Sequence, residues 1–377
     1  PQGGWYRLQV RSRANPARVV DGHSRWGVGM LVACIGQSNM KEWFRTGEDL
    51  QAHPLLRKFD SGGWEVFERS GNGAIAFGNR IAERLRIPVG IMDFAVDGSG
   101  LRREADWGVG YWQDTAPGSI YQNFIDGVSD AGGALEFVVW TQGEADAARG
   151  TVTEKEYRYS LQSFIQRQVR ADVRNASDQP QLPFLIVSMI KRPYGKDEPH
   201  QGIRNAQRQV AEQLADCYFA ATTLDLDNLG KEHLAPAAYI TLGQRVAQTV
   251  LYVLGLETYY RGPEVAAAVQ VDAATIDVKI RHRGGSNFRP QYGASGWEVI
   301  AAGEPVPIAA VSKKDAETLR IALDRPLQEP AVIRYMFGAL PDVRRPVRDN
   351  TALQLPLEAY QGLVRTETSQ DESLAKK

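Results

Sequence analysis

The residues of this chain that could do chemistry stand where predicted strands end. Gly36-Gln37-Ser38-Asn39-Met40 directly follows an apolar run at residues 28–35, which is long enough for a strand buried on both faces. Gly36 allows a tight turn, and Ser38 can supply an attacking hydroxyl and a backbone N–H. A Gly-x-Ser match by itself recurs by accident, so Ser38 needs partners from other segments.

Three more strand ends supply such partners. They carry Gly98 in Asp97-Gly-Ser-Gly100, Gln142 in Thr141-Gln-Gly-Glu-Ala-Asp146, and His233 in Asp227-Asn-Leu-Gly-Lys-Glu-His233. The carboxyl ends of parallel strands lie along one edge of a sheet, so we expect these groups to meet. Acyl transfer needs a nucleophile, a base and donors for the developing negative charge. We predict that Ser38 attacks and His233 takes its proton. The N–H groups of Ser38 and Gly98 and the amide of Gln142 would bind the oxyanion.

Residues next to these positions are predicted to support the site. Asn39 would tie the serine turn to a neighbouring loop, and Glu144 would hold the Gln142 loop by hydrogen bonds. Gln37 is assigned to the same supporting set. Glu144 and Asp146 could also suggest the acid pair of a glycosidase, but the chain has 45 acidic residues, so two close carboxylates mean little.

Three aromatic residues follow the Gly98 segment, namely Trp107, Tyr111 and Trp112. Aromatic side chains at such spacing can form a core, whereas in a glycine-rich, charged loop a flat exposed ring suits stacking on a sugar. We assign all three to substrate binding and keep the core interpretation as the alternative.

The elements that must position these residues alternate between strand and helix. Strands are predicted at residues 28–35, 89–96, 135–140, 183–190 and 219–226, and helices at 74–86, 120–128, 154–173, 202–215 and 236–254. This order predicts an α/β fold with a parallel sheet covered by helices on both faces. From residue 262 short alternating runs predict a β-sandwich.

The domain boundaries follow from this change of pattern. We predict a domain at residues 28–257, and a smaller β-sandwich domain made of residues 1–27 and 258–364. That domain is discontinuous because the strand-like segment 4–12 is expected to pair with the C-terminal strands. Residues 365–377 are polar and charged, and are predicted to be a flexible tail.

Composition excludes several classes of function. The net charge is −1 and the pI is about 6.7, with acids and bases interspersed, which argues against a nucleic-acid or membrane-surface partner. No apolar run approaches the ~20 residues that cross a bilayer, so membrane insertion is not expected. The remaining histidines show no metal-ligand spacing, and we predict neither metal nor cofactor. The chain starts at Pro1, and we expect that a leader preceded it and that the protein is secreted, periplasmic or at the cell surface.

The motifs resemble those of SGNH hydrolases, in the branch of sialate O-acetylesterases and carbohydrate acetylesterases. The resemblance rests on Gly36-Gln-Ser-Asn-Met40, Trp140-Thr-Gln-Gly-Glu-Ala-Asp146, the Gly98-Ser-Gly100 turn, Ile120-Tyr121, and the histidine before the helix with Gly243-Gln-Arg-Val-Ala247. It covers about residues 28–255. It implies a flavodoxin-like sheet, no metal, and removal of acetyl esters from sugars.

The chain departs from this family at one position. The family has an acid two or three residues before the histidine, which orients its ring, but this chain has Lys231 and Gly230 there. We predict Asp227 as the orienting acid. The alternatives, in order, are a Ser–His dyad without an acid, and Glu232.

The expected function is therefore a serine esterase that removes O-acetyl groups from an oligosaccharide or polysaccharide. One alternative is a catalytically weak carbohydrate-binding or adhesion protein, suggested by the missing acid and the β-sandwich. The other is an esterase for lipid acyl groups, which would need an apolar trough beside Ser38.

Overall fold

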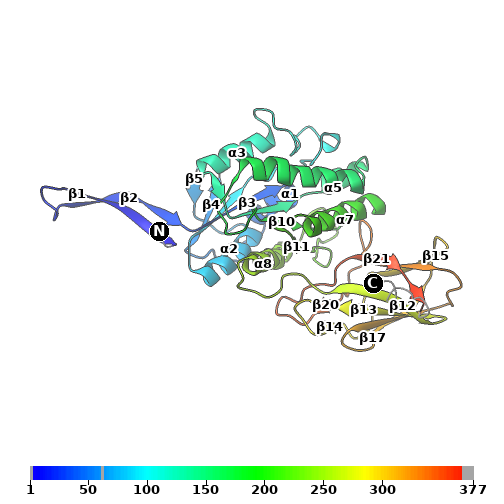
Figure 1. Cartoon of the computed structure of the whole chain (residues 1–377). Coiled ribbons are helices and arrows are strands. Elements are labelled where there is room, and N and C mark those ends of the chain that lie inside the picture. Colours follow the sequence, from blue (N-terminus) through cyan, green and yellow to red (C-terminus); the bar gives the residue numbers. More distant parts are fainter. Residues whose placement is uncertain (1–2, 61–62, 367–377) are drawn as a thin grey trace.

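A seven-stranded sheet forms the centre of the larger of two packed parts (Figure 1). The computed structural model describes residues 3–60 and 63–366. The strand order is β11-β10-β8-β3-β6-β4-β5, parallel except that β5 is antiparallel to β4. The strands are β3 (Met30–Gly36), β4 (Leu56–Asp60), β5 (Gly63–Glu65), β6 (Val89–Asp93), β8 (Phe137–Thr141), β10 (Phe184–Val187) and β11 (Cys217–Ala221).

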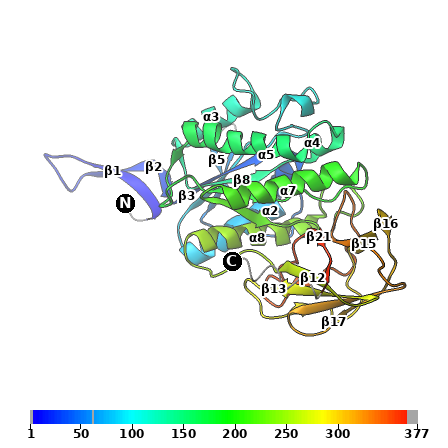
Figure 2. The same cartoon turned by 45° about the vertical axis from the view of Figure 1, so that its right-hand side comes forward.

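Helices cover both faces of this sheet (Figure 2). On one face lie α1 (Ser38–Arg45), α2 (Asn72–Leu85) and α8 (Pro236–Val253). On the other lie α3 (Ile120–Asp130), α5 (Glu154–Ser163) and α7 (Asp197–Gln213). Side chains of β3 alternate between the two cores, with Val32 and Cys34 in one and Ala33 and Ile35 in the other. The predicted α/β class, with helices on both faces, is confirmed.

Shorter elements complete this part. They are α4 (Glu144–Arg149), a 3₁₀ turn η1 (Arg103–Ala105), a π-helical segment η2 (Phe164–Val169), α6 (Arg170–Asp172), β7 (Ala134–Leu135) and β9 (Arg174–Asn175). The single long helix expected over residues 154–173 is thus α5, η2 and α6 in succession. The sequence did not predict β4 and β5, which extend the sheet at one edge.

The C-terminal part is a β-sandwich, as predicted. A five-stranded sheet, β17-β18-β13-β12-β22, packs on a four-stranded sheet, β16-β15-β19-β21, around one buried apolar cluster. The strands are β12 (Glu264–Asp272), β13 (Thr275–Arg281), β14 (Phe288–Arg289), β15 (Trp297–Ala301), β16 (Glu304–Pro305), β17 (Ile308–Lys313), β18 (Thr318–Leu323), β19 (Ala331–Tyr335), β20 (Arg348–Asp349), β21 (Tyr360–Leu363) and β22 (Arg365–Thr366). Residues 365–366 of the predicted tail pair with β12, and the rest of that tail lies outside the described residues.

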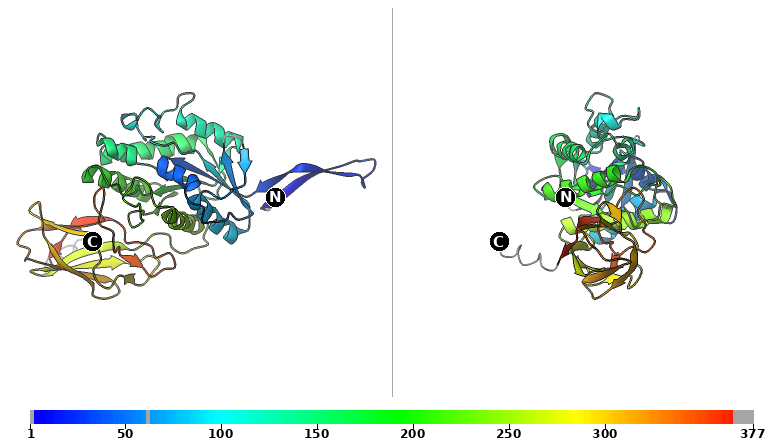
Figure 3. Two further views of the ribbon diagram at one scale, coloured as in Figure 1. Left: turned by 180° about the vertical axis from the view of Figure 1, so that it is seen from behind. Right: turned by 90° about the vertical axis from the view of Figure 1, so that its right-hand side faces the viewer.

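The expected place of the first strand is wrong. β1 (Gly4–Arg11) pairs with β2 (Val19–Val28) in a separate two-stranded ribbon. This ribbon projects from the sheet at the end opposite the β-sandwich (Figures 1 and 3). Residues 19–28 supply the partner strand and satisfy the backbone of β1 locally. Directly paired residues such as Tyr6 and Trp26 are both exposed.

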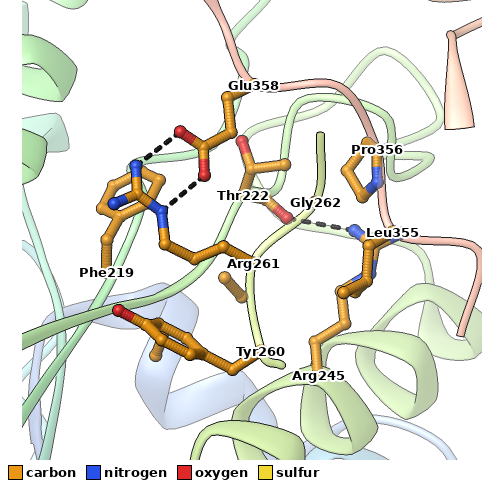
Figure 4. A pocket seen from close by; sticks show the side chains of 11 residues that line it. Phe219, Thr222, Arg245, Tyr260, Arg261, Gly262, Leu355, Pro356 and Glu358 are labelled. Atoms are coloured by element: carbon orange, nitrogen blue, oxygen red, sulfur yellow. Dashed lines mark hydrogen bonds and ion pairs between the residues drawn. The ribbon is translucent and has the colours of Figure 1, made fainter. Parts of the chain in front are cut away.

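Charged side chains join the two parts of the chain. Arg261 binds Glu358 through Nε at 2.6 Å and Nη2 at 2.5 Å, and Nη2 also binds Glu212 of α7 at 3.1 Å (Figure 4). Asp225, which follows β11, is fully buried and binds Arg245 of α8 and Arg348 of β20. Burial alone would raise the pKa of Asp225, but the two guanidinium groups outweigh it and hold the pKa below its usual value.

Within residues 3–60 and 63–366, no helix is both long enough and apolar enough to cross a membrane.

Candidate active site

Ser38 stands at the carboxyl end of the central strand. β3 is hydrogen-bonded to β6 on one side and β8 on the other, and α1 begins at Ser38. Gly36 turns the chain with φ at 133°, and a Cβ there would lie 2.0 Å from the carbonyl oxygen of Thr141, so only glycine fits. As the first helical residue, Ser38 has a backbone N–H without a partner inside α1. The turn therefore presents both its hydroxyl and an N–H.

A pocket of ≈ 580 Å³ opens beside Ser38, and His233 and Gly98 also line it. The three residues come from the loops after β3, β11 and β6, whose carboxyl ends share one edge of the sheet. Among the described residues no hydrogen bond joins Ser38 to His233, and both are partly exposed. In unliganded enzymes such bonds are often long and tighten when substrate binds. The geometry therefore puts a hydroxyl and an imidazole in one pocket.

Asn39 connects the serine turn to three other elements. Its side chain is buried, and Nδ2 donates to Glu144 Oε1 at 2.9 Å and to the carbonyl of Glu232 at 3.4 Å. Its Oδ1 accepts from the hydroxyl of Tyr239 on α8 at 3.0 Å. Asn39 thereby ties the turn to α4, to α8 and to the residue that precedes His233.

Glu144 is a buried carboxylate in the pocket wall. It is 3% exposed, and Oε2 has no hydrogen-bond partner among the described residues. Burial raises the pKa of Glu144, while Arg192, the Asn39 hydrogen bond and the charge of His233 act in the opposite direction. Glu144 is thus electrostatically linked to His233.

Gln142 lies behind the pocket wall, and it is not part of the lining. Its Nε2 has three acceptors, Gln37 Oε1 at 3.3 Å, the Ser99 carbonyl at 3.2 Å and Asp146 Oδ2 at 2.5 Å. Its Oε1 accepts from the hydroxyl of Tyr157 at 2.8 Å. Since an amide NH₂ has only two hydrogens, no donor of Gln142 remains for a ligand.

Gln37 instead occupies the pocket wall. Its Oε1 accepts from the N–H groups of Gly143 and Ala145 at 3.3 and 3.2 Å, besides Gln142. Backbone N–H groups need an acceptor, which fixes the orientation of the amide. Nε2 of Gln37 has no hydrogen-bond partner among the described residues. It is also not among the buried side-chain atoms that lack a partner, so it is not shut off from solvent. The supporting residue Gln37 therefore has the donor that was expected from Gln142.

The comparison with known families decides the identity of the chain. The model of the family described as carbohydrate esterase, sialic acid-specific acetylesterase, matches residues 38–252, more than half of the chain. The chain belongs to this family. It is therefore a carbohydrate O-acetylesterase, as the resemblance in its motifs implied.

A solved structure shows the same fold. XAC1771, a carbohydrate acetylesterase from Xanthomonas citri, matches with a TM-score of 0.70 and 20% identity over 96% of this chain and 85% of its own. A protein from Arabidopsis thaliana has a TM-score of 0.46 and 19% identity over 59% of this chain and 98% of its own. Est24, a carbohydrate acetylesterase from Sinorhizobium meliloti, has a TM-score of 0.37 and 12% identity over 60% and 100%. No curated protein matches the chain.

The esterase does not bring its expected acid to the pocket. Asp227 is exposed, and its Oδ1 accepts from the N–H of Leu229 at 2.8 Å in a local turn. Asp227 is absent from the pocket lining, whereas the third candidate, Glu232, lines it. The assignment of Asp227 is therefore corrected, because its carboxylate caps its own loop.

The three expected aromatic residues have different surroundings. Trp107 is 55% exposed and lines the pocket, with the Arg149 guanidinium 4.7 Å from its ring centroid. Trp112 is fully buried, and its Nε1 donates to the carbonyl of Gly36 and to Ser99 Oγ. A ring sealed in the core cannot stack on a sugar, so Trp112 is corrected to a core residue. Tyr111 is half-buried and does not line the pocket.

Sequence reasoning missed Tyr194. It is 45% exposed, lines the same pocket as Trp107, and lies under the guanidinium of Arg192 at 4.4 Å. Arg192-Pro-Tyr194 follows the strand predicted at 183–190, at the same edge of the sheet. The strand-end rule that located Ser38 and His233 could have found it.

Proposed function

We propose that this carbohydrate esterase uses Ser38 to remove acetyl groups from an oligosaccharide or polysaccharide through an acetyl-enzyme. The observation that carries the proposal is one pocket lined by Ser38 and His233, which lie 195 positions apart in the sequence. Ser38 Oγ attacks the acetyl carbonyl while His233 takes its proton. The same imidazole then protonates the departing sugar oxygen, and a water molecule activated by His233 releases acetate from Ser38.

The negative charge of the tetrahedral intermediate needs donors beside Ser38. We assign this role to the N–H groups of Ser38 and Gly98, and to Nε2 of Gln37 in place of Gln142. Both Gln37 and Gly98 line the pocket, and Gly98 has a φ of 73° that favours glycine. Gln142 positions Gln37 by donating to its Oε1.

We propose that the base works as a Ser–His dyad, assisted by a buried charge. Asp225 is held by Arg245 and Arg348, and Asp227 by its own turn, so neither is available to His233. Glu144 shares the pocket, and its carboxyl group interacts electrostatically with His233. The same Asn39 amide that binds Glu144 also binds the carbonyl just before His233.

The residues that line the pocket argue against an esterase for lipid acyl groups. Carboxylates of Glu42, Asp97, Glu144 and Glu232 line it, and a long acyl chain would have to displace their water. We therefore expect short acyl groups to be preferred.

The test is acetate release from a panel of acetylated polysaccharides and from aryl esters of increasing chain length. Ser38→Ala and His233→Ala should each abolish release, and aryl acetate should be cleaved faster than aryl octanoate. An unchanged rate in the Ser38→Ala variant would refute the mechanism. Faster cleavage of the octanoate would favour the alternative of an esterase for lipid acyl groups.

A further inference from the structure

We propose that the esterase acts on acetyl groups of neutral sugars and discriminates against sugars that carry a carboxylate. This inference rests on the proposed function and names the substrate class of the same pocket. The lining contains four carboxyl groups, those of Glu42, Asp97, Glu144 and Glu232, but only one arginine and no lysine among the described residues. The pocket is therefore an unfavourable environment for an anion.

The one arginine of the lining is already engaged. Arg192 donates through Nη1 to the carbonyl of Glu144 at 2.9 Å and through Nη2 to the hydroxyl of Tyr194 at 2.7 Å. The guanidinium is stacked on the Tyr194 ring, Nε is sealed from solvent, and the residue is only 8% exposed. Of the five N–H groups of Arg192, two donate within the protein and the one on Nε is sealed from solvent, so only one N–H on each Nη remains for a sugar carboxylate.

Basic groups at the rim are engaged as well. Arg45 binds Asp97 at 2.9 Å, so it neutralises a lining acid. Arg149 lies over the ring of Trp107 and donates Nη2 to the carbonyl of Asp106 at 2.8 Å. His233 must be uncharged to accept the proton of Ser38, so it adds no positive charge when the reaction starts.

Two of the lining acids have no cationic partner among the described residues. Glu42 accepts a hydrogen bond from Thr46 on its own helix, and Glu232 interacts with the Tyr194 hydroxyl. Two uncompensated carboxylates face any substrate that enters, while the exposed rings of Trp107 and Tyr194 offer apolar faces suited to an uncharged sugar.

The consequence concerns the description of the family itself. A sialic acid carries a carboxylate, so we infer that this member departs from the substrate named in its family's description. The expected discrimination is at least tenfold in kcat/KM, which corresponds to about 1.4 kcal/mol.

The experiment uses two aryl acetates that differ only in charge, 4-acetoxybenzoate and its methyl ester. Acetate release by the full chain is measured as kcat/KM, and each value is divided by the alkaline hydrolysis rate of the same ester. We expect the neutral ester to be preferred at least tenfold at low salt, and the preference to shrink as salt screens the pocket. Equal values, or a preference for the anion, would overturn the inference while leaving the esterase intact.

Variants assign the effect to the pocket. Glu42→Gln combined with Glu232→Gln keeps the hydrogen-bonding shape and removes two charges, and should raise the anion-to-neutral ratio at least threefold. Glu83→Gln on α2, exposed and outside the pocket, is the control and should leave the ratio unchanged. An unchanged ratio in the double variant would contradict the proposal. If neither aryl ester nor any acetylated glycan were cleaved, the proposed function would fail together with this inference.

Discussion

Gln142 and Gln37 form a buried pair, in which Nε2 of Gln142 donates to Oε1 of Gln37 at 3.3 Å. The direction of this hydrogen bond decides which amide can reach a substrate. Gln142 donates its amide hydrogens to buried acceptors. Gln37, in contrast, accepts hydrogen bonds from the protein through Oε1, and its Nε2 remains at the pocket. Its place just before Ser38 puts that nitrogen beside the proposed nucleophile.

Gln37→Glu tests this assignment with an isosteric change. A carboxylate still accepts from the N–H groups of Gly143 and Ala145, but the donor toward the pocket is lost. We expect kcat to fall by ~10²–10³ with little change in KM, because the donor acts on charge that develops only in the transition state. Steady-state kinetics with an aryl acetate measure it, and thermal unfolding checks that the fold is kept. A variant within threefold of wild type would return the oxyanion role to another group.

Trp107 and Trp112 offer a comparison of one residue type in two environments. Trp107→Ala should raise KM for an acetylated glycan roughly three- to tenfold at unchanged thermal stability, because an exposed stacking face is lost. Trp112→Ala should lower the free energy of unfolding by ~3–5 kcal/mol, because it empties a core site packed against Trp140. Urea unfolding and kinetics on both variants separate the two roles. The reverse pattern would show that the corrected assignment of Trp112 is mistaken.

Asp146 predicts a pH-dependent stability. It is fully buried, and its burial raises the pKa to about 6, although the N–H of Leu101 and the amide of Gln142 partly oppose this. Because the folded-state pKa exceeds the unfolded value of 3.8, the folded state binds more protons in between, and stability falls as pH rises through this range. Relative to Asp146→Asn, wild type should lose roughly 2 kcal/mol of unfolding free energy from about pH 4 to about pH 7. Urea unfolding of both proteins measures this change. A difference in unfolding free energy between wild type and Asp146→Asn that did not change with pH would contradict the account.

Asp225 predicts the strength of the junction between the sheet and the β-sandwich. Asp225→Asn leaves the guanidinium groups of Arg245 and Arg348 without their buried counter-charge, and should cost ~3–5 kcal/mol of unfolding free energy. The matched control is Asp97→Asn, because the partner of Asp97, Arg45, is half-exposed. This variant should lose less than about 1 kcal/mol of unfolding free energy. Equal losses in the two variants, measured by urea unfolding, would show that burial of the pair does not matter here.

The strand-end rule was sufficient to locate Ser38, Gly98 and His233. Parallel strands align their carboxyl ends, so a polar residue just after each buried strand is placed by topology alone. The same rule does not give the direction of a side chain. The side chain of Gln142 turns inward, where Tyr157 of α5 binds its Oε1 and Asp146 accepts from its Nε2, and the first of these contacts cannot be inferred from the motif.

Two other predictions, for β1 and for Trp112, differ from the structure because a sequence motif does not show which segments its residues contact. The partner of β1 is β2, in which few apolar residues alternate with polar ones. Its pairing therefore depends on its proximity to β1 along the chain more than on a pattern of apolar residues. Trp112 is buried because Phe124 of α3 and Phe164 of η2 pack against it, and these tertiary contacts cannot be inferred from the glycine-rich loop that carries it.

The most direct measurement is covalent labelling of the proposed nucleophile, Ser38. The full chain is incubated with an aryl phosphonate, a mimic of the tetrahedral intermediate, and the modified peptide is located by mass spectrometry. The account predicts a single adduct on Ser38, formed in wild type and lost in Ser38→Ala, with acetate release declining in proportion to labelling. Labelling of another residue, or full acetate release from protein labelled at Ser38, would contradict it.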